Sequence, residues 1–243
     1  MKIANRMENL SPSVTMAITA LGRELKAQGK DILSFSAGEP DFDTPEIIKQ
    51  AAIKAIQDGH TKYTAVEGII PTKQAIINKL KKDHNLDYKL DNIVISNGAK
   101  HSLFNLFQVL IEEGDEVIIP APYWVTYPEQ VKFSDGVPVF IDTDDSTEFK
   151  ITAEQLKAAI TPKTKILLLN TPSNPTGSVY SREELTAIAE VLKGTDILVF
   201  SDEMYEKIMY NGKKFTAAAE ISDDMFQRTI TINGLSKAVA MTG

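Results

Sequence analysis

The sequence predicts an α/β fold in three layers, with a mostly parallel β-sheet between two layers of helices. From residue 92 onward, short runs that are apolar at nearly every position alternate with segments of helical periodicity. Strands of this kind are buried on both faces, which is typical of a parallel sheet covered by helices. The predicted strands are 93–95, 117–119, 137–141, 166–169, 197–200 and 229–232.

The residues before this region predict helices and one short strand. Helical patterns cover 14–28, 44–57 and 72–82, and the run 32–36 predicts the strand. We expect Thr44 to cap the second helix and Pro45 to occupy its first turn. A cluster of Gly, Pro and Asp after the short strand predicts a loop.

The composition excludes several classes of protein. Of the 243 residues, 43% are hydrophobic and 24% are charged, as expected for a soluble globular chain. A net charge of −7 without a block of Lys and Arg argues against nucleic-acid partners. No apolar run is long enough to span a membrane and the N-terminus lacks a signal-peptide core, so we expect a cytoplasmic protein without a membrane partner. Because cysteine is absent and the three histidines are scattered, we expect no metal site.

Polar and aromatic residues gather directly after the predicted strands. These clusters are 97–100, 120–124, 170–177, 201–205 and 233–237. Because the carboxyl ends of parallel strands meet at one edge of a sheet, we expect the clusters to share one crevice, where ligands bind in such folds. Lys237 is the residue expected to carry the chemistry, since an amine held away from water can condense with an aldehyde. Taken singly, each cluster is better explained as a turn, a cap or core packing.

Four motifs occur in a fixed order along the chain. They are Ser-Ala-Gly-Glu-Pro-Asp-Phe-Asp-Thr-Pro at 36–45, Ser-Asn-Pro-Thr-Gly at 173–177, Ser-Asp-Glu-Met-Tyr at 201–205 and Ser-Lys-Ala-Val-Ala-Met-Thr-Gly at 236–243. Together they resemble the pyridoxal-phosphate aminotransferases of fold type I, in the class I branch that includes bacterial aspartate aminotransferases. The resemblance implies pyridoxal 5′-phosphate as cofactor, amino acids and 2-oxo acids as substrates, and a homodimer. Residues 1–43 would contribute to a small domain, and residues 44–243 would form an incomplete cofactor-binding large domain.

The resemblance assigns roles around the cofactor ring. Lys237 would hold the cofactor as a Schiff base and then move the proton of the substrate α-carbon. Asp202 would face the pyridinium nitrogen and keep the ring protonated. Tyr205 and Asn174 would donate hydrogen bonds to the ring 3′-oxygen, and Trp124 would stack on the ring. Asn174 and Trp124 would also contact the substrate.

The resemblance places the cofactor phosphate at the start of the helix that follows 93–95, where backbone N–H groups attract an anion. The residues expected there are Gly98, Ala99, Lys100 and Ser236. Tyr63 would reach across a two-fold interface toward the phosphate of the neighbouring subunit.

Substrate contacts are predicted at three further positions. Gly38 would lie beside the substrate α-carboxylate, where a side chain would crowd the amino acid. Lys100 and Thr15 would supply a cation and a hydroxyl for a distal carboxylate, which favours aspartate with 2-oxoglutarate as substrates. An aromatic amino acid or prephenate is the alternative substrate, and a lyase on the same scaffold is the alternative reaction. A noncatalytic regulatory relative is a third interpretation, which the retained lysine argues against.

Members of this family continue past the position of Gly243. The resemblance implies a Trp-Arg stretch whose arginine binds the phosphate, and a later arginine that binds the substrate α-carboxylate. It also places a further strand between 93–95 and 229–232. We therefore expect little or no turnover from these 243 residues alone.

Overall fold

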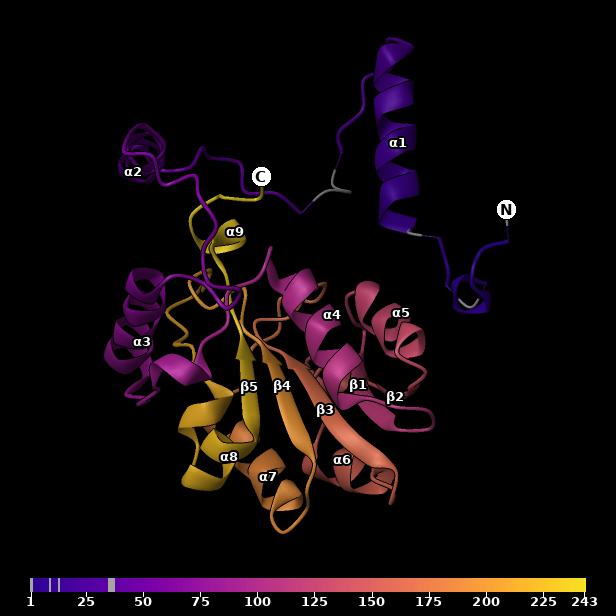
Figure 1. Cartoon of the computed structure of the whole chain (residues 1–243). Coiled ribbons are helices and arrows are strands. Elements are labelled where there is room, and N and C mark those ends of the chain that lie inside the picture. The colour runs from indigo at the N-terminus through magenta and orange to yellow at the C-terminus, as the bar shows by residue number, and fades with distance from the viewer. Residues whose placement is uncertain (1, 9, 13, 35–37) are drawn as a thin grey trace.

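A five-stranded sheet lies at the centre of the computed structural model, which describes residues 2–8, 10–12, 14–34 and 38–243 (Figure 1). Its strands are β1 (Glu116–Ala121), β2 (Val137–Asp142), β3 (Thr164–Asn170), β4 (Leu198–Asp202) and β5 (Thr229–Ile232). The spatial order is β2-β1-β3-β4-β5, and every pairing is parallel. The predicted parallel sheet is confirmed, with five of the six expected core strands present in the described residues.

Helices cover both faces of the sheet, as predicted. The helices of the described residues are α1 (Val14–Ala27), α2 (Glu46–Gln57), α3 (Ile70–His84), α4 (Ala99–Leu110), α5 (Thr126–Phe133), α6 (Ala153–Ala159), α7 (Arg182–Leu192), α8 (Asp223–Arg228) and α9 (Leu235–Ala238), of which α4 to α8 pack on the sheet. Short 3₁₀ turns occupy Asn5–Met7, Leu90–Asn92, Asp145–Thr147 and Ala218–Glu220. Within β3, Ile166 and Leu168 pack with α4 and α5, whereas Leu167 and Leu169 pack with α6, α7 and α8. This alternation across two covered faces explains why the strand is apolar at every position.

Two predicted strands are wrong. Residues 93–95 are extended but join no ladder, because their backbone groups bond to nearby loops instead. The Ile95 N–H donates to the Glu67 carbonyl at 3.1 Å, and the Ile93 N–H donates to the Leu90 carbonyl at 3.2 Å. An apolar run becomes a strand only when a neighbouring strand takes up its backbone groups. Of the predicted strand 32–36, the described residues 32–34 are also outside any strand, and 35–36 lie outside the described residues.

The start of α2 also differs from the prediction. Pro45, not Thr44, precedes the helix, and α2 has no side-chain cap. The Thr44 hydroxyl donates instead to the Ala240 carbonyl at 2.5 Å. The loop before α2 is therefore tied to the segment that follows Lys237.

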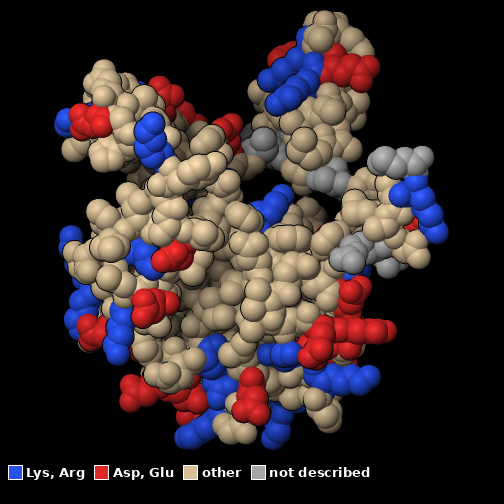
Figure 2. Space-filling model, in the orientation of Figure 1, with Lys and Arg blue, Asp and Glu red and all other residues tan. Residues whose placement is uncertain are grey.

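Helices α1 and α2 stand apart from the sheet in Figure 1, and α2 contains no buried residue. The predicted division between residues 43 and 44 stays a prediction. On the face drawn in Figure 2, basic and acidic side chains are intermingled toward the rim, and the centre is largely uncharged. Within the described ranges, no helix has both the length and the apolar character needed to cross a membrane.

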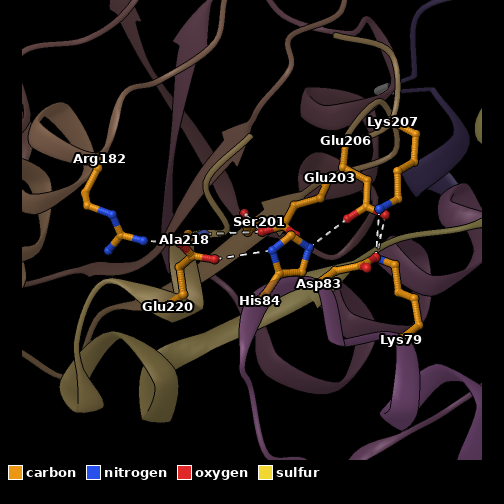
Figure 3. A network of polar contacts seen from close by, with 10 residues as sticks. All are labelled: Lys79, Asp83, His84, Arg182, Ser201, Glu203, Glu206, Lys207, Ala218 and Glu220. Carbon is orange, nitrogen blue, oxygen red and sulfur yellow. Dashed lines mark hydrogen bonds and ion pairs between the residues drawn. The ribbon is translucent and has the colours of Figure 1, made fainter. Parts of the chain in front are cut away.

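A polar cluster joins the end of α3 to the chain beyond β4 (Figure 3). His84 lies between two carboxylates, with Nε2 3.1 Å from Glu206 and Nδ1 3.2 Å from Glu220. Lys79 forms an ion pair with Glu206, and Lys207 binds Asp83 at 2.7 Å. Burial favours the neutral form of Glu206, but hydrogen bonds from His84 and Lys79 outweigh it and lower its pKa to about 2. This cluster anchors the segment that carries Asp202 and Tyr205.

Candidate active site

The carboxyl ends of β3 and β4 hold the first part of the site. Asn170 and Asp202 are the last residues of these strands and are directly paired in the sheet. The Asn170 amide donates to the Asp202 carbonyl at 2.9 Å, and its oxygen accepts from the Asn174 N–H at 2.7 Å. Asn170 thus fixes the loop that carries Asn174 against the end of β4. As predicted, residues that follow different strands meet at one edge of the sheet.

Asp202 is a buried carboxylate, with only 4% of its surface exposed. The Tyr127 hydroxyl donates to its Oδ2 at 2.7 Å, and the Met204 N–H donates to its Oδ1 at 3.3 Å. Burial raises the pKa of Asp202 to about 6, although both hydrogen bonds act to lower it. Among the described side chains, no Lys, Arg or His forms an ion pair with this carboxylate. A cationic ring nitrogen at this position would complete its charge balance.

Asn174 and Tyr205 lie side by side next to Asp202. The Asn174 amide donates to the Tyr205 hydroxyl at 3.4 Å, and both side chains are partly buried. Burial, together with the nearby Asp202 charge, raises the pKa of Tyr205, so this phenol stays protonated at neutral pH. The two predicted donors to the cofactor 3′-oxygen are therefore adjacent, which suits a shared acceptor.

Lys237 lies on α9, directly after β5, and its side chain is partly exposed. Its ammonium group donates to the carbonyl of Gly38, so the two predicted residues meet across 199 positions of the chain. A Cβ added at Gly38 would meet no atom within 4 Å, so there is open space at this position. The Thr242 hydroxyl donates to Glu39 at 2.6 Å, which is a second hydrogen bond between the chain near Gly38 and the chain after Lys237.

The start of α4 has the features of an anion site. Gly98 precedes the helix with φ +80°, a left-handed conformation that glycine adopts readily, and it provides no side-chain cap. Its own N–H bonds to the Ser96 carbonyl at 2.8 Å, so it is not free. In the described parts of the chain, the N–H groups of Ala99 and Lys100 have no hydrogen-bond partner. Two open N–H groups at a helix N-terminus fit a phosphate. Ser236 is partly buried on α9.

Trp124 is partly buried in the loop between β1 and α5. The Lys100 ammonium lies 5.0 Å from the centre of its ring. Its ring also meets Tyr127 edge to face, at 5.3 Å between centroids and 85° between planes. Tyr127 was not predicted as a site residue. The only signal in the sequence was its position one helical turn after Trp124.

Two predicted residues lie apart from this cluster. Thr15 is exposed in the first turn of α1, which stands away from the sheet in Figure 1. Tyr63 is fully exposed in the segment between α2 and α3. Asp83, His84 and Glu206 lie close enough to share a metal ion, but Lys79 and Lys207 already bind two of these groups. That cluster therefore has the charge balance of a structural network.

Comparison with known proteins extends these observations. Residues 30–243 match the family model of aminotransferase class I and II. The chain is 55% identical to an aspartate aminotransferase of Bacillus sp. (strain YM-2) and 52% identical to an aspartate/prephenate aminotransferase of Nitrosomonas europaea. These alignments cover 99% and 100% of this chain but 62% of each relative, so the chain spans less than two thirds of their length.

Solved structures agree with this assignment. The aspartate aminotransferase of Rhizobium meliloti superposes with a TM-score of 0.96 at 45% identity, covering 100% of this chain and 61% of that one. The aspartate aminotransferase of Thermus thermophilus with maleate gives 0.95 at 41% identity, covering 100% and 63%. The family predicted from the four motifs is confirmed: the chain belongs to the class I and II aminotransferases, whose enzymes use pyridoxal phosphate.

Proposed function

We propose that the protein is a pyridoxal-phosphate-dependent aminotransferase that moves an amino group between L-aspartate and 2-oxoglutarate. The observation that carries the proposal is the buried Asp202 carboxylate, which has two hydrogen-bond donors and no ion-pair partner in the described chain. Lys237, Asn174 and Tyr205 lie at the same edge of the sheet. A buried carboxylate without an ion-pair partner is a costly arrangement, which supports a functional origin.

Each residue in this group has a distinct task in the proposal. Pyridoxal phosphate, when bound, supplies an electron-withdrawing ring that stabilises negative charge at the substrate α-carbon. Lys237 provides the amine that binds the cofactor aldehyde and later carries the proton to and from the α-carbon. Asp202 holds a proton on the ring nitrogen. Asn174 and Tyr205 donate to the ring 3′-oxygen, and Trp124 packs on the ring face.

Phosphate binding is assigned to the start of α4. The N–H groups of Ala99 and Lys100 are open there, and Gly98 keeps the approach free of a side chain. The Ser236 hydroxyl is a further donor in the proposal. Tyr63 is assigned to the partner subunit's phosphate in a cytoplasmic homodimer, a role that its full exposure in one chain supports.

Aspartate is the preferred substrate because relatives with 52% to 55% identity carry that name. Gly38 is assigned to the α-carboxylate, and Lys100 with Thr15 to the distal carboxylate. Prephenate, or an aromatic amino acid, is the second candidate, since the relative from Nitrosomonas europaea is named an aspartate/prephenate aminotransferase. A lyase would share the ring-binding residues and differ in its products.

The experiment combines spectroscopy with product analysis. The full-length protein is mixed with pyridoxal phosphate, reduced with borohydride and digested, and the modified peptide is located by mass spectrometry. We expect label on Lys237 in the wild type, none at this position in Lys237→Ala, and full labelling in the matched variant Lys193→Ala, which changes an exposed lysine. Aspartate or prephenate is then offered with the matching oxo acid. A wild type that gives neither labelled Lys237 nor oxo acid refutes the proposal, and release of ammonia would indicate a lyase.

A further inference from the structure

Tyr127 contacts Asp202 and Trp124, two of the residues that the proposal places around the cofactor ring. It lies in the first turn of α5 and is 1% exposed. Its hydroxyl donates to Asp202 Oδ2 at 2.7 Å, and its ring packs edge to face with Trp124. Its N–H also bonds to the Trp124 carbonyl at 3.0 Å. One rigid side chain therefore connects the loop after β1 with the end of β4.

The direction of the Tyr127 hydrogen bond is fixed by the chemistry of the pair. Burial and the nearby Asp202 charge hold the pKa of Tyr127 well above its usual value, so its hydroxyl keeps the proton and donates it. The second donor to Asp202 is the Met204 N–H, at the longer distance of 3.3 Å. Hydrogen bonds to an ionised acceptor are stronger than those between neutral groups. Tyr127 is therefore the main donor that stabilises the Asp202 carboxylate.

A donor to this carboxylate also affects where a shared proton resides. A buried carboxylate that faces a pyridine nitrogen competes with that nitrogen for one proton. Each hydrogen bond to the carboxylate makes it a weaker base, so the proton stays on the nitrogen. Loss of the hydroxyl would transfer the proton toward Asp202 and weaken the electron-withdrawing power of the ring.

We infer that Tyr127 is a positioning residue, whose hydroxyl keeps Asp202 ionised and aligned toward the cofactor ring nitrogen and whose ring supports Trp124. The inference rests on the proposed function, because it requires the ring to lie beside Asp202. It adds a residue from α5 to a site otherwise built from segments that directly follow strands, the start of α4 and the loop at Gly38.

The test uses the full-length protein and compares two variants that each remove one buried hydroxyl. Tyr127→Phe keeps the ring and its packing. Tyr180→Phe is the matched control, because Tyr180 is 4% exposed and its hydroxyl accepts from the Ile151 N–H at 2.9 Å instead of donating to Asp202. The first readout is the ¹³C titration of the Asp202 carboxyl in the apoprotein, assigned with Asp202→Asn. The second is the ¹⁵N resonance of the ring nitrogen in protein loaded with ¹⁵N-labelled pyridoxal phosphate.

In Tyr127→Phe we expect the proton affinity of Asp202 to rise about tenfold, as expected for loss of one hydrogen bond to a charged group. The ring nitrogen resonance should move toward that of unprotonated pyridine, and kcat should fall by about the same factor with little change in KM. Tyr180→Phe should match the wild type in all three. A fluorinated tyrosine at position 127, a stronger donor, should shift both resonances in the opposite direction and provides the test if Tyr127→Phe does not fold.

Two outcomes separate this inference from the proposed function. If the wild type binds cofactor and transaminates, but Tyr127→Phe leaves the Asp202 titration and the ring nitrogen resonance unchanged, the inference alone is overturned. If the wild type binds no pyridoxal phosphate, the proposed function fails and the inference fails with it. Equal shifts in Tyr127→Phe and Tyr180→Phe would also overturn it, because they would indicate a general effect on folding.

Discussion

Replacing Asp202 with asparagine should stabilise the apoprotein, although Asp202 is central to the proposed site. Burial raises the pKa of Asp202 from 3.8 to about 6 in the folded state. The unfolded chain ionises this group from pH 3.8 upward, while the folded chain holds its proton until about pH 6. The contribution of Asp202 to the free energy of unfolding is therefore greatest below pH 3.8, falls as pH rises from 3.8 to about 6 and is level above that. The full loss is about 3 kcal/mol, since each pKa unit corresponds to about 1.4 kcal/mol.

The net effect of Asp202→Asn is smaller than this loss. An amide cannot accept both the Tyr127 hydroxyl and the Met204 N–H in the present geometry, because one end of it is a donor. Losing one such hydrogen bond costs about 1 kcal/mol. We therefore expect the variant to be more stable than the wild type by about 2 kcal/mol at pH 8. At pH 5, where the folded carboxyl is largely protonated, the gain should be smaller by about 1 kcal/mol.

Urea unfolding of the cofactor-free protein, followed by circular dichroism at pH 5 and pH 8, measures both values. Asp196→Asn is the control, because Asp196 is exposed and its change should stay within about 0.5 kcal/mol at either pH. An Asp202→Asn variant that is less stable than the wild type at pH 8 would refute the reasoning. So would a gain that does not grow between the two pH values.

Three further changes should lower stability, each measured by urea unfolding. His84→Gln should cost about 2 kcal/mol at pH 6, because Glu206 and Glu220 each lose one partner but keep a lysine or an arginine. The hydrogen bond to Glu206 raises the pKa of His84 above 6.5. The cost of His84→Gln is therefore complete below pH 6.5 and should shrink as pH rises through the pKa of His84 in the folded state. An equal cost at pH 9 would contradict this prediction. Gly68→Ala should cost more than about 1 kcal/mol, since φ is +103° and the new Cβ would lie 2.5 Å from Ile95; a neutral effect would count against this. Leu167→Ala, at a fully buried position of β3, should cost about 2–5 kcal/mol, and a cost under 1 would mean that the core collapses around the cavity.

The sequence predicted the five strands that form the sheet. Residues 166–169 and 197–200 are apolar throughout because helices cover both faces of the sheet, and that pattern is visible without a structure. Residues 93–95 have the same composition but form no strand, since strand formation depends on pairing with another segment. Local composition carries no information about that partner.

The grouping of residues in the candidate site was predictable to a similar extent. Asp202, Asn174 and Lys237 were predicted as site residues because each stands in a cluster after a predicted strand and belongs to a motif, and their roles stay predictions. Tyr127 was missed because an aromatic residue in an amphipathic helix most often fills a core, and only the packing of α5 brings its hydroxyl to a residue 75 positions away. Thr15 makes no contact with this group in the described chain, and its role stays a prediction.

The carboxylates on the segment from β4 to Glu206 differ in whether a nearby cation balances their charge. Asp202, Glu203 and Glu206 are all buried carboxylates within five positions. Glu206 is paired with His84 and Lys79, and its low pKa marks a balanced structural network (Figure 3). Burial raises the pKa of Glu203 to about 7 and favours its neutral form, and no ion pair in the described chain opposes this. Asp202 also has no ion-pair partner among the described side chains, but it differs from Glu203 because it lies beside the predicted ring-binding residues Asn174 and Tyr205. The Glu206 carboxylate is balanced by His84 and Lys79, whereas the Asp202 carboxylate has no such partner in the described chain. This difference supports a ligand that brings a positive charge to Asp202.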